Sequence, residues 1–194
     1  MNIFQLYFNL GVHHIANIYS LDHILFITCL CAVYVFKQWK QILVLVTAFT
    51  IGHTTSLALA TFKLVSVNSA LIEFLIPATI FITAFWNLFL KKDGVSSGTH
   101  WVKYITAMFF GLIHGLGFSY YLQTLLGSEK SIILPLFSFN VGIEAGQLIV
   151  VCGILLLSNI ITSWFKVLRR DWVLIFSGAG MGVALMLMIN RFPW

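Results

Sequence analysis

Five ionisable side chains of the kinds that bind metal ions lie within long apolar stretches of this sequence. They are Asp22, His23, His53, His114 and Glu144. Because an ionisable group inside a bilayer carries a large free-energy cost, such residues indicate a functional site. Imidazole and carboxylate ligands from several segments suit borderline divalent metals such as Ni, Zn, Co or Fe better than thiolate-preferring Cu(I), but they do not identify the metal. The five residues therefore predict a site for a divalent transition metal.

The spacing of these residues predicts that they share one depth. Counted at about 1.5 Å per helical residue from the inner end of each apolar stretch, all five lie roughly 17 to 24 Å above the inner boundary. That height falls in the outer half of a hydrocarbon core about 30 Å thick. Polar residues recur at helical spacing around two of them, so we expect them to face the interior and surround the ligands. These surrounding residues are Asn140 and Gln147 on one strip and Thr50 and Thr54 on the other.

Further ionisable residues lie close to the predicted site. His13 and His14 precede the first apolar stretch, and they either fold inward to join the site or stay at the membrane interface. His14 is the preferred ligand of the two. Glu73 lies near the outer end of its stretch, where it is either at the mouth of the site or an ordinary interfacial charge.

A structural explanation of the same residues is also open. Buried polar side chains of membrane helices often only hydrogen-bond from one helix to another. Two pairs of glycines, Gly111 with Gly115 and Gly178 with Gly182, have the four-residue spacing that brings helices into close contact. We expect both pairs to be packing positions.

The elements that must position these residues are membrane-spanning helices. Hydrophobic residues make up 60% of the 194 residues and charged residues only 9%, against about 25% in soluble domains. Six apolar stretches each approach the roughly 20 residues that cross a bilayer. They are 21–36, 42–62, 70–90, 102–122, 132–157 and 172–189. The predicted fold is one all-α polytopic membrane domain over 1–194, with an interfacial or re-entrant segment at 1–20 and a helix bundle at 21–190.

Basic residues predict the orientation of this bundle, because cytoplasmic loops carry the excess of Lys and Arg. Three of them, Lys63, Lys130 and Arg191, fall on one side. Eight fall on the other, namely Lys37, Lys40, Lys91, Lys92, Lys103, Lys166, Arg169 and Arg170. Both termini are therefore expected on the periplasmic side of a bacterial inner membrane. Because these residues are scattered at span ends, the net charge of +5 does not form a nucleic-acid-binding patch. The expected partners are the lipid bilayer and a metal ion, and the oligomeric state is not predicted.

Four sequence strings resemble the HupE/UreJ family: DHILF from Asp22, AFTIGHTTSLALA from Ala48, FGLIHGLGF from Phe110 and FNVGIEAGQL from Phe139. The resemblance spans nearly the whole chain, and it implies a nickel permease that accompanies hydrogenase or urease maturation. It also implies that the family's motif residues fall on His14, Asp22, His23, His53, His114 and Glu144 with Gln147. The chain departs from the pattern in two ways, since eight residues separate His14 from Asp22, two more than in the hydrogenase-associated pattern, and Ser20 replaces a glycine.

Three functions remain open at this point. The leading one is a secondary permease that binds a divalent metal, most simply nickel, in the outer half and moves it inward. Against it, the inner half offers Thr47, Thr83 and Asn87 but no ionisable residue. The second is an intramembrane hydrolase in which His residues hold zinc and Glu144 or Asp22 acts as general base. The third is a non-catalytic assembly or sensor subunit.

Overall fold

Helices form almost all of the chain that the structure describes. The computed structural model describes residues 2–17, 21–89, 97–127 and 131–193. Within these residues there are seven α-helices and two short segments of other helical type. The α-helices are α1 (Ile3–Ala16), α2 (Leu21–Cys31), α3 (Trp39–Thr61), α4 (Ser69–Leu88), α5 (Ser97–Leu126), α6 (Ile133–Asn159) and α7 (Arg169–Asn190). A 3₁₀ turn at Phe36–Gln38 precedes α3, and a π-helical turn at Ile160–Trp164 follows α6.

Helices α3 to α7 are each long and apolar enough to cross a membrane. The shortest, α4, has 20 residues, which at about 1.5 Å per residue spans roughly the 30 Å of a hydrocarbon core. Five of the six predicted stretches therefore correspond to continuous helices whose ends differ by a few residues. The prediction of an all-α polytopic membrane bundle is confirmed.

The first predicted span, 21–36, is wrong as a continuous helix. Helix α2 ends at Cys31, and its 11 residues cover only about 16 Å. Among the residues that follow, Val33 and Val35 have β-branched side chains, which lower helix propensity. The amide of Val35 instead donates to Oε1 of Gln38 at 3.1 Å. Only α1 and α2 together, bent by 65°, reach the length of a span, so they form either a sixth, broken span or a re-entrant loop.

Helix α3 packs most closely against α5, and glycines allow their backbones to touch. A Cβ atom on Gly52 would overlap the carbonyl oxygen of Met108, and one on Gly111 would overlap that of Phe49. A Cβ atom on Gly115 would likewise meet the carbonyl oxygen of His53. The predicted role of Gly111 and Gly115 in packing is therefore confirmed. Since Gly111 meets Phe49 and Gly115 meets His53, the two helices run parallel, and His53 lies level with His114.

The other predicted glycine pair is different. No atom lies within 4 Å of a Cβ built on Gly178 or on Gly182, so these residues do not form a helix contact within the described chain. The packing glycine of α7 is Gly180, where a Cβ would overlap Sγ of Cys29 in α2. The spacing rule identified the helix correctly but selected the wrong face, because it does not say which side of a helix has a neighbour.

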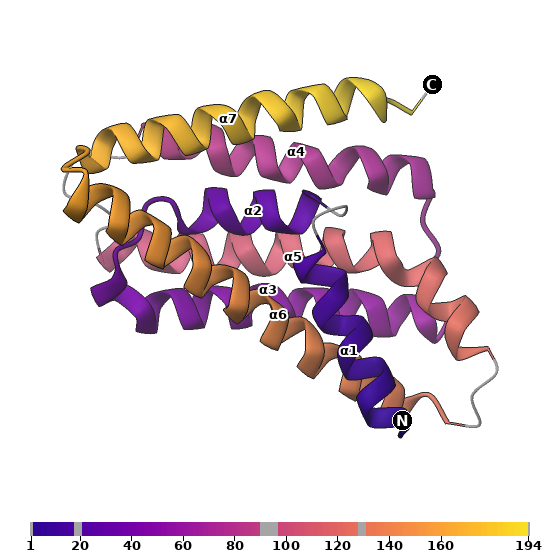
Figure 1. Ribbon diagram of the computed structural model, residues 1–194. Helices are drawn as coiled ribbons and strands as arrows, with labels where there is room; N and C mark the ends of the chain where they lie inside the picture. The colour runs from indigo at the N-terminus through magenta and orange to yellow at the C-terminus, as the bar shows by residue number, and fades with distance from the viewer. Residues whose placement is uncertain (1, 18–20, 90–96, 128–130, 194) are drawn as a thin grey trace.

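Helix α1 packs along α6 and crosses the bundle obliquely (Figure 1). Gly11 approaches the carbonyl of Phe139, and Gly142 approaches the carbonyl of Phe8, so backbones again touch. Gly146 accommodates Val12 and Ile15 in the same way. The N-terminal segment is thereby held against the bundle, with its last turn at the centre of the molecule.

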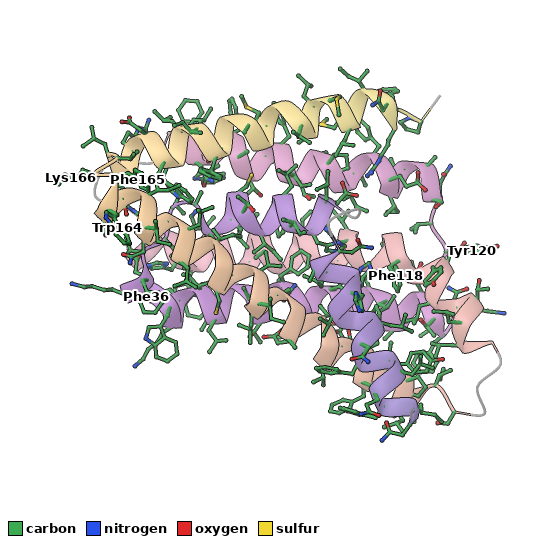
Figure 2. All side chains as sticks on the ribbon, viewed as in Figure 1. Phe36, Phe118, Tyr120, Trp164, Phe165 and Lys166 are labelled. Carbon is green, nitrogen blue, oxygen red and sulfur yellow. The ribbon has the colours of Figure 1, made fainter. Side chains whose placement is uncertain are left out.

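The chain termini and a group of aromatic residues lie at opposite ends of the bundle. Figure 1 shows both chain termini at the same end of the bundle. Figure 2 shows Lys166 with the aromatic residues Phe36, Trp164 and Phe165 at the opposite end, as expected of a membrane interface. The residues Lys91, Lys92 and Lys130, which entered the orientation argument, lie outside the described residues, as do Ser20 and Tyr19.

We expect Gly52→Ala to lower the stability of the folded protein by about 1 to 3 kcal/mol, because the added methyl group overlaps backbone that cannot rotate away. Thermal unfolding of the purified protein in detergent measures this. Gly178→Ala is the matched control, and it should leave stability unchanged or raise it slightly through helix propensity. Equal stability of the two variants would contradict the close contact of α3 with α5.

Candidate metal centre

Three histidines from three helices converge inside the bundle, toward the end where the chain termini lie. They are His14 at the end of α1, His23 in α2 and His53 in α3. One ring nitrogen from each can be chosen so that all three lie within 4.8 Å of one another. The ring of His23 lies 4.5 Å from that of His14 and 6.1 Å from that of His53, centroid to centroid. Because metal–imidazole bonds are about 2.1 Å long, the rings must close slightly around an ion.

The two close helix pairs position these rings. His53 lies where α3 touches α5, beside Gly111 and Gly115. His14 follows Gly11 by one turn, so the contact of α1 with α6 carries it inward, and its ring packs 3.9 Å from that of Phe118. His13, one residue earlier, points out of the bundle and is exposed.

Five ring nitrogens of the clustered histidines and of His114 are buried without a hydrogen-bond partner among the described residues. They are Nε2 of His14, Nε2 of His23, both nitrogens of His53 and Nδ1 of His114. An unsatisfied buried polar group costs about 1 to 3 kcal/mol, so such a cluster is unfavourable by itself. Each neutral imidazole has one unprotonated nitrogen that can bind a metal. The residues present therefore fit a divalent metal ion.

A cavity of about 400 Å³ leads from the end of the bundle where the termini lie to His14 and His23, with His53 fully buried behind its lining. Its lining includes His14, His23 and His114, with Asp22 and Glu73 above them. Among the described residues of the lining, Arg191, just after α7, is the one further residue with a formal charge. The two carboxylates and one guanidinium give the cavity a net charge of about −1, which favours cations.

Asp22 lines the cavity but does not belong to the group of convergent ligand atoms, which differs from its prediction as a metal ligand. Oδ2 accepts a hydrogen bond from Nη1 of Arg191 at 3.0 Å, while Oδ1 is buried and unpartnered among the described residues. The sequence analysis used Arg191 only as a topology signal. No local pattern indicates this ion pair, because 169 positions separate its members.

His114 adjoins the three-histidine cluster without belonging to it. Its ring lies 5.2 Å from that of His23, and its Nε2 lies 2.9 Å from Oγ1 of Thr79 in α4. Thr79 is a further residue that the sequence analysis did not select. The only sequence signal for Thr79 is its four-residue spacing from Thr83, which places both residues on one face of α4.

Glu144 lies deeper than the histidines, and so differs from the expectation of one shared depth. Its Oε1 accepts a hydrogen bond from Oγ1 of Thr47 at 2.7 Å. Thr47 precedes His53 by six residues in α3, which corresponds to about 9 Å along the helix. The second oxygen of Glu144 is buried and unpartnered among the described residues, and Glu144 is not in the lining of the cavity.

The other polar residues of the two strips join α3 to α6. Thr50 donates to Oε1 of Gln147 at 2.8 Å, and Thr54 donates to Oδ1 of Asn140 at 2.7 Å. These bonds hold α6 against α3, while α6 holds α1. Gln147, Asn140, Thr50 and Thr54 therefore support the helices that bear His14 and His53.

The fold and the histidine-lined cavity place the chain in the class of polytopic membrane proteins with a histidine cluster suited to a metal ion. The sequence model of the family described as HupE / UreJ protein matches residues 1–191. The chain belongs to the HupE/UreJ family. No curated protein and no solved structure gave a match to the chain.

We expect the purified protein to bind one divalent ion per chain, with nickel and zinc as the metals to test. His14→Ala, His23→Ala and His53→Ala should each weaken binding by more than about tenfold, since even indirect supports of a metal contribute that much. Isothermal titration calorimetry measures the affinity. His13→Ala is the control, because its exposed ring lies beside His14 in sequence only. Wild-type affinity in all three site variants would remove these histidines from the site.

Proposed function

We propose that this protein is a secondary permease for a divalent transition metal, with nickel as its first candidate substrate. The observation that carries the proposal is the group of three convergent imidazoles with unpartnered nitrogens, reached by an open, net acidic cavity. Membership of the HupE/UreJ family supports it, because that family is associated with nickel handling.

The ligand set favours a borderline metal. Nitrogen ligands suit Ni²⁺, Zn²⁺ and Co²⁺, whereas Cu(I) prefers thiolates. Cys29 and Cys31 are buried toward the other end of α2, and none of the chain's cysteines lines the cavity. The proposed substrate is therefore a divalent ion and not cuprous copper.

We propose that the cavity opens to the periplasm of a bacterial cell and that the inner end faces the cytoplasm. Among the described residues the inner end carries the larger share of the positive charge, in agreement with the positive-inside rule. It has Lys37, Lys40, Lys103, Lys166, Arg169 and Arg170, whereas the end with the cavity has Lys63 and Arg191.

Glu144 is the next cation-binding group on the inward route in this proposal. It lies about one and a half turns below His53, measured along α3 at Thr47, and one of its oxygens is unpartnered among the described residues. An ion that leaves the histidines would thus meet a carboxylate before it reaches Thr83 and Asn87. A membrane potential of about 100 mV, negative inside, supplies about 4.6 kcal/mol for a divalent ion along this path.

Uptake of nickel into proteoliposomes tests the proposal. With an inside-negative potential set by a potassium gradient and valinomycin, we expect wild-type protein and His13→Ala to accumulate nickel. His53→Ala should lose uptake, and Glu144→Gln should retain binding but transport more slowly, because its carboxylate serves the later step. Metal binding without any potential-driven uptake in the wild type would reject the permease.

A zinc-dependent hydrolase is the second candidate, favoured by one observation. Three histidines beside an open cavity are also the arrangement of catalytic zinc sites, which keep one coordination position for water. The general base would then be Asp22, because Glu144 lies outside the cavity lining, and Asp22 already binds Arg191. Zinc-dependent cleavage of a peptide or ester substrate by the wild type, lost in His53→Ala, would favour this function over transport.

The orientation has its own test. We expect alkaline phosphatase fused after Trp194 to be active and green fluorescent protein fused at the same place to be dark, because the C-terminus is proposed to be periplasmic. Fusions in the 160–168 connection should give the opposite result. A bright C-terminal fluorescent fusion would reverse the proposed direction of the cavity.

A further inference from the structure

Thr79 makes two contacts through one hydroxyl group in the buried interface of α4 with α5. Its Oγ1 lies 2.7 Å from the carbonyl oxygen of Ile76, and 2.9 Å from Nε2 of His114. Both Thr79 and His114 are almost completely buried, with exposed fractions of 2% and 1%. The contact between the two side chains is therefore shielded from bulk solvent.

Counting protons decides the direction of both bonds. A threonine hydroxyl has a single hydrogen, and a carbonyl oxygen can only accept. The hydrogen of Thr79 is therefore donated to Ile76, and the hydroxyl oxygen must accept from His114. His114 thus has its proton on Nε2, and its Nδ1 bears the free lone pair.

The ring that bears this nitrogen lies next to the three-histidine cluster, although His114 is not part of the group whose ligand atoms lie within 4.8 Å of one another. Nδ1 of His114 is buried and has no hydrogen-bond partner among the described residues. The His114 ring contacts that of His23 edge-on, at 5.2 Å between centroids, and it lines the same cavity as His14 and His23. With three imidazoles around an ion, one position of a tetrahedron is left for a further ligand.

We propose that Thr79 is a positioning residue that fixes the tautomer of His114, so that Nδ1 is the nitrogen presented to the metal as a fourth ligand. The tautomer follows from the geometry alone, whereas its use by a metal rests on the proposed function. Without the hydroxyl, Nε2 and Nδ1 compete for the proton, and the form with Nδ1 protonated cannot bind the ion. Thr79 therefore acts on the metal through His114 and does not touch it.

The chain provides a matched control for this contact. Thr83, one turn later in α4, donates its hydroxyl hydrogen to the carbonyl oxygen of Thr79 at 2.8 Å. Thr83→Val and Thr79→Val both remove a hydroxyl bond to the helix backbone and add the same methyl group. Only Thr79→Val also removes the acceptor of His114.

Nitrogen NMR of histidine-labelled protein reads the tautomer directly, with the His114 signals assigned by their loss in His114→Gln. In wild type, Thr79→Ser and Thr83→Val, we expect the Nε2-protonated form. In Thr79→Val we expect a mixture of both neutral tautomers. An Nδ1-protonated His114 in the wild type would overturn the proposal, even if Thr79→Val did not fold.

Titration of the same proteins with Ni²⁺ and Zn²⁺ tests the consequence. Thr79→Val should bind about 10- to 100-fold more weakly, the usual loss when a hydrogen-bond partner of a metal-binding histidine is removed. Thr79→Ser should recover most of the affinity, and Thr83→Val should match the wild type. Equal affinity of Thr79→Val and Thr83→Val would overturn the role of Thr79. A wild type that binds neither metal would instead reject the proposed function and the fourth ligand, while the tautomer would still be decided by the spectra.

Discussion

Backbone contact between helices is the constraint on which the rest of the structure depends. Helices α3 and α5 touch at Gly52, Gly111 and Gly115, and this contact sets His53 level with His114. Helices α1 and α6 touch at Gly11 and Gly142, and this contact brings His14 to the same place. Without hydrophobic collapse between helices in lipid, such close packing supplies much of the attraction. The glycines thus determine both the stability of the bundle and the geometry of its centre.

The polar residues inside the bundle fall into two groups, those paired with one another and those without a partner. The α3 to α6 pairs satisfy their polar groups with one another, as Thr54 does with Asn140, and these groups need no ligand. The histidines are the opposite case, because five of their buried nitrogens have no partner among the described residues. The cost of leaving such groups unpaired is largest where water is excluded. The contrast separates residues that support the helices from residues that are available to a metal.

The helix bundle and the candidate ligands could be predicted from the sequence, because the length of an apolar stretch and an ionisable residue within it are both local features. The depth calculation treated each stretch as a straight helix perpendicular to the membrane. Helix α6 crosses obliquely, so the carboxylate of Glu144 binds Thr47, below the histidines (Figure 1). At the break after Cys31, the half-buried side chain of Gln38 accepts a hydrogen bond from the backbone amide of Val35. Arg191 and Thr79 act through partners far away in sequence, and only the fold reveals them.

The contact of α1 with α6 has a consequence for how the protein is made. Helix α1, which carries His14, is synthesised well before the helix that holds it, which begins at Ile133. During synthesis α1 must therefore wait, without its packing partner, until more than half of the chain has been inserted. The three-histidine cluster cannot exist in any shorter nascent chain. The position of His14 is therefore fixed only when a helix made late in synthesis packs against one made early.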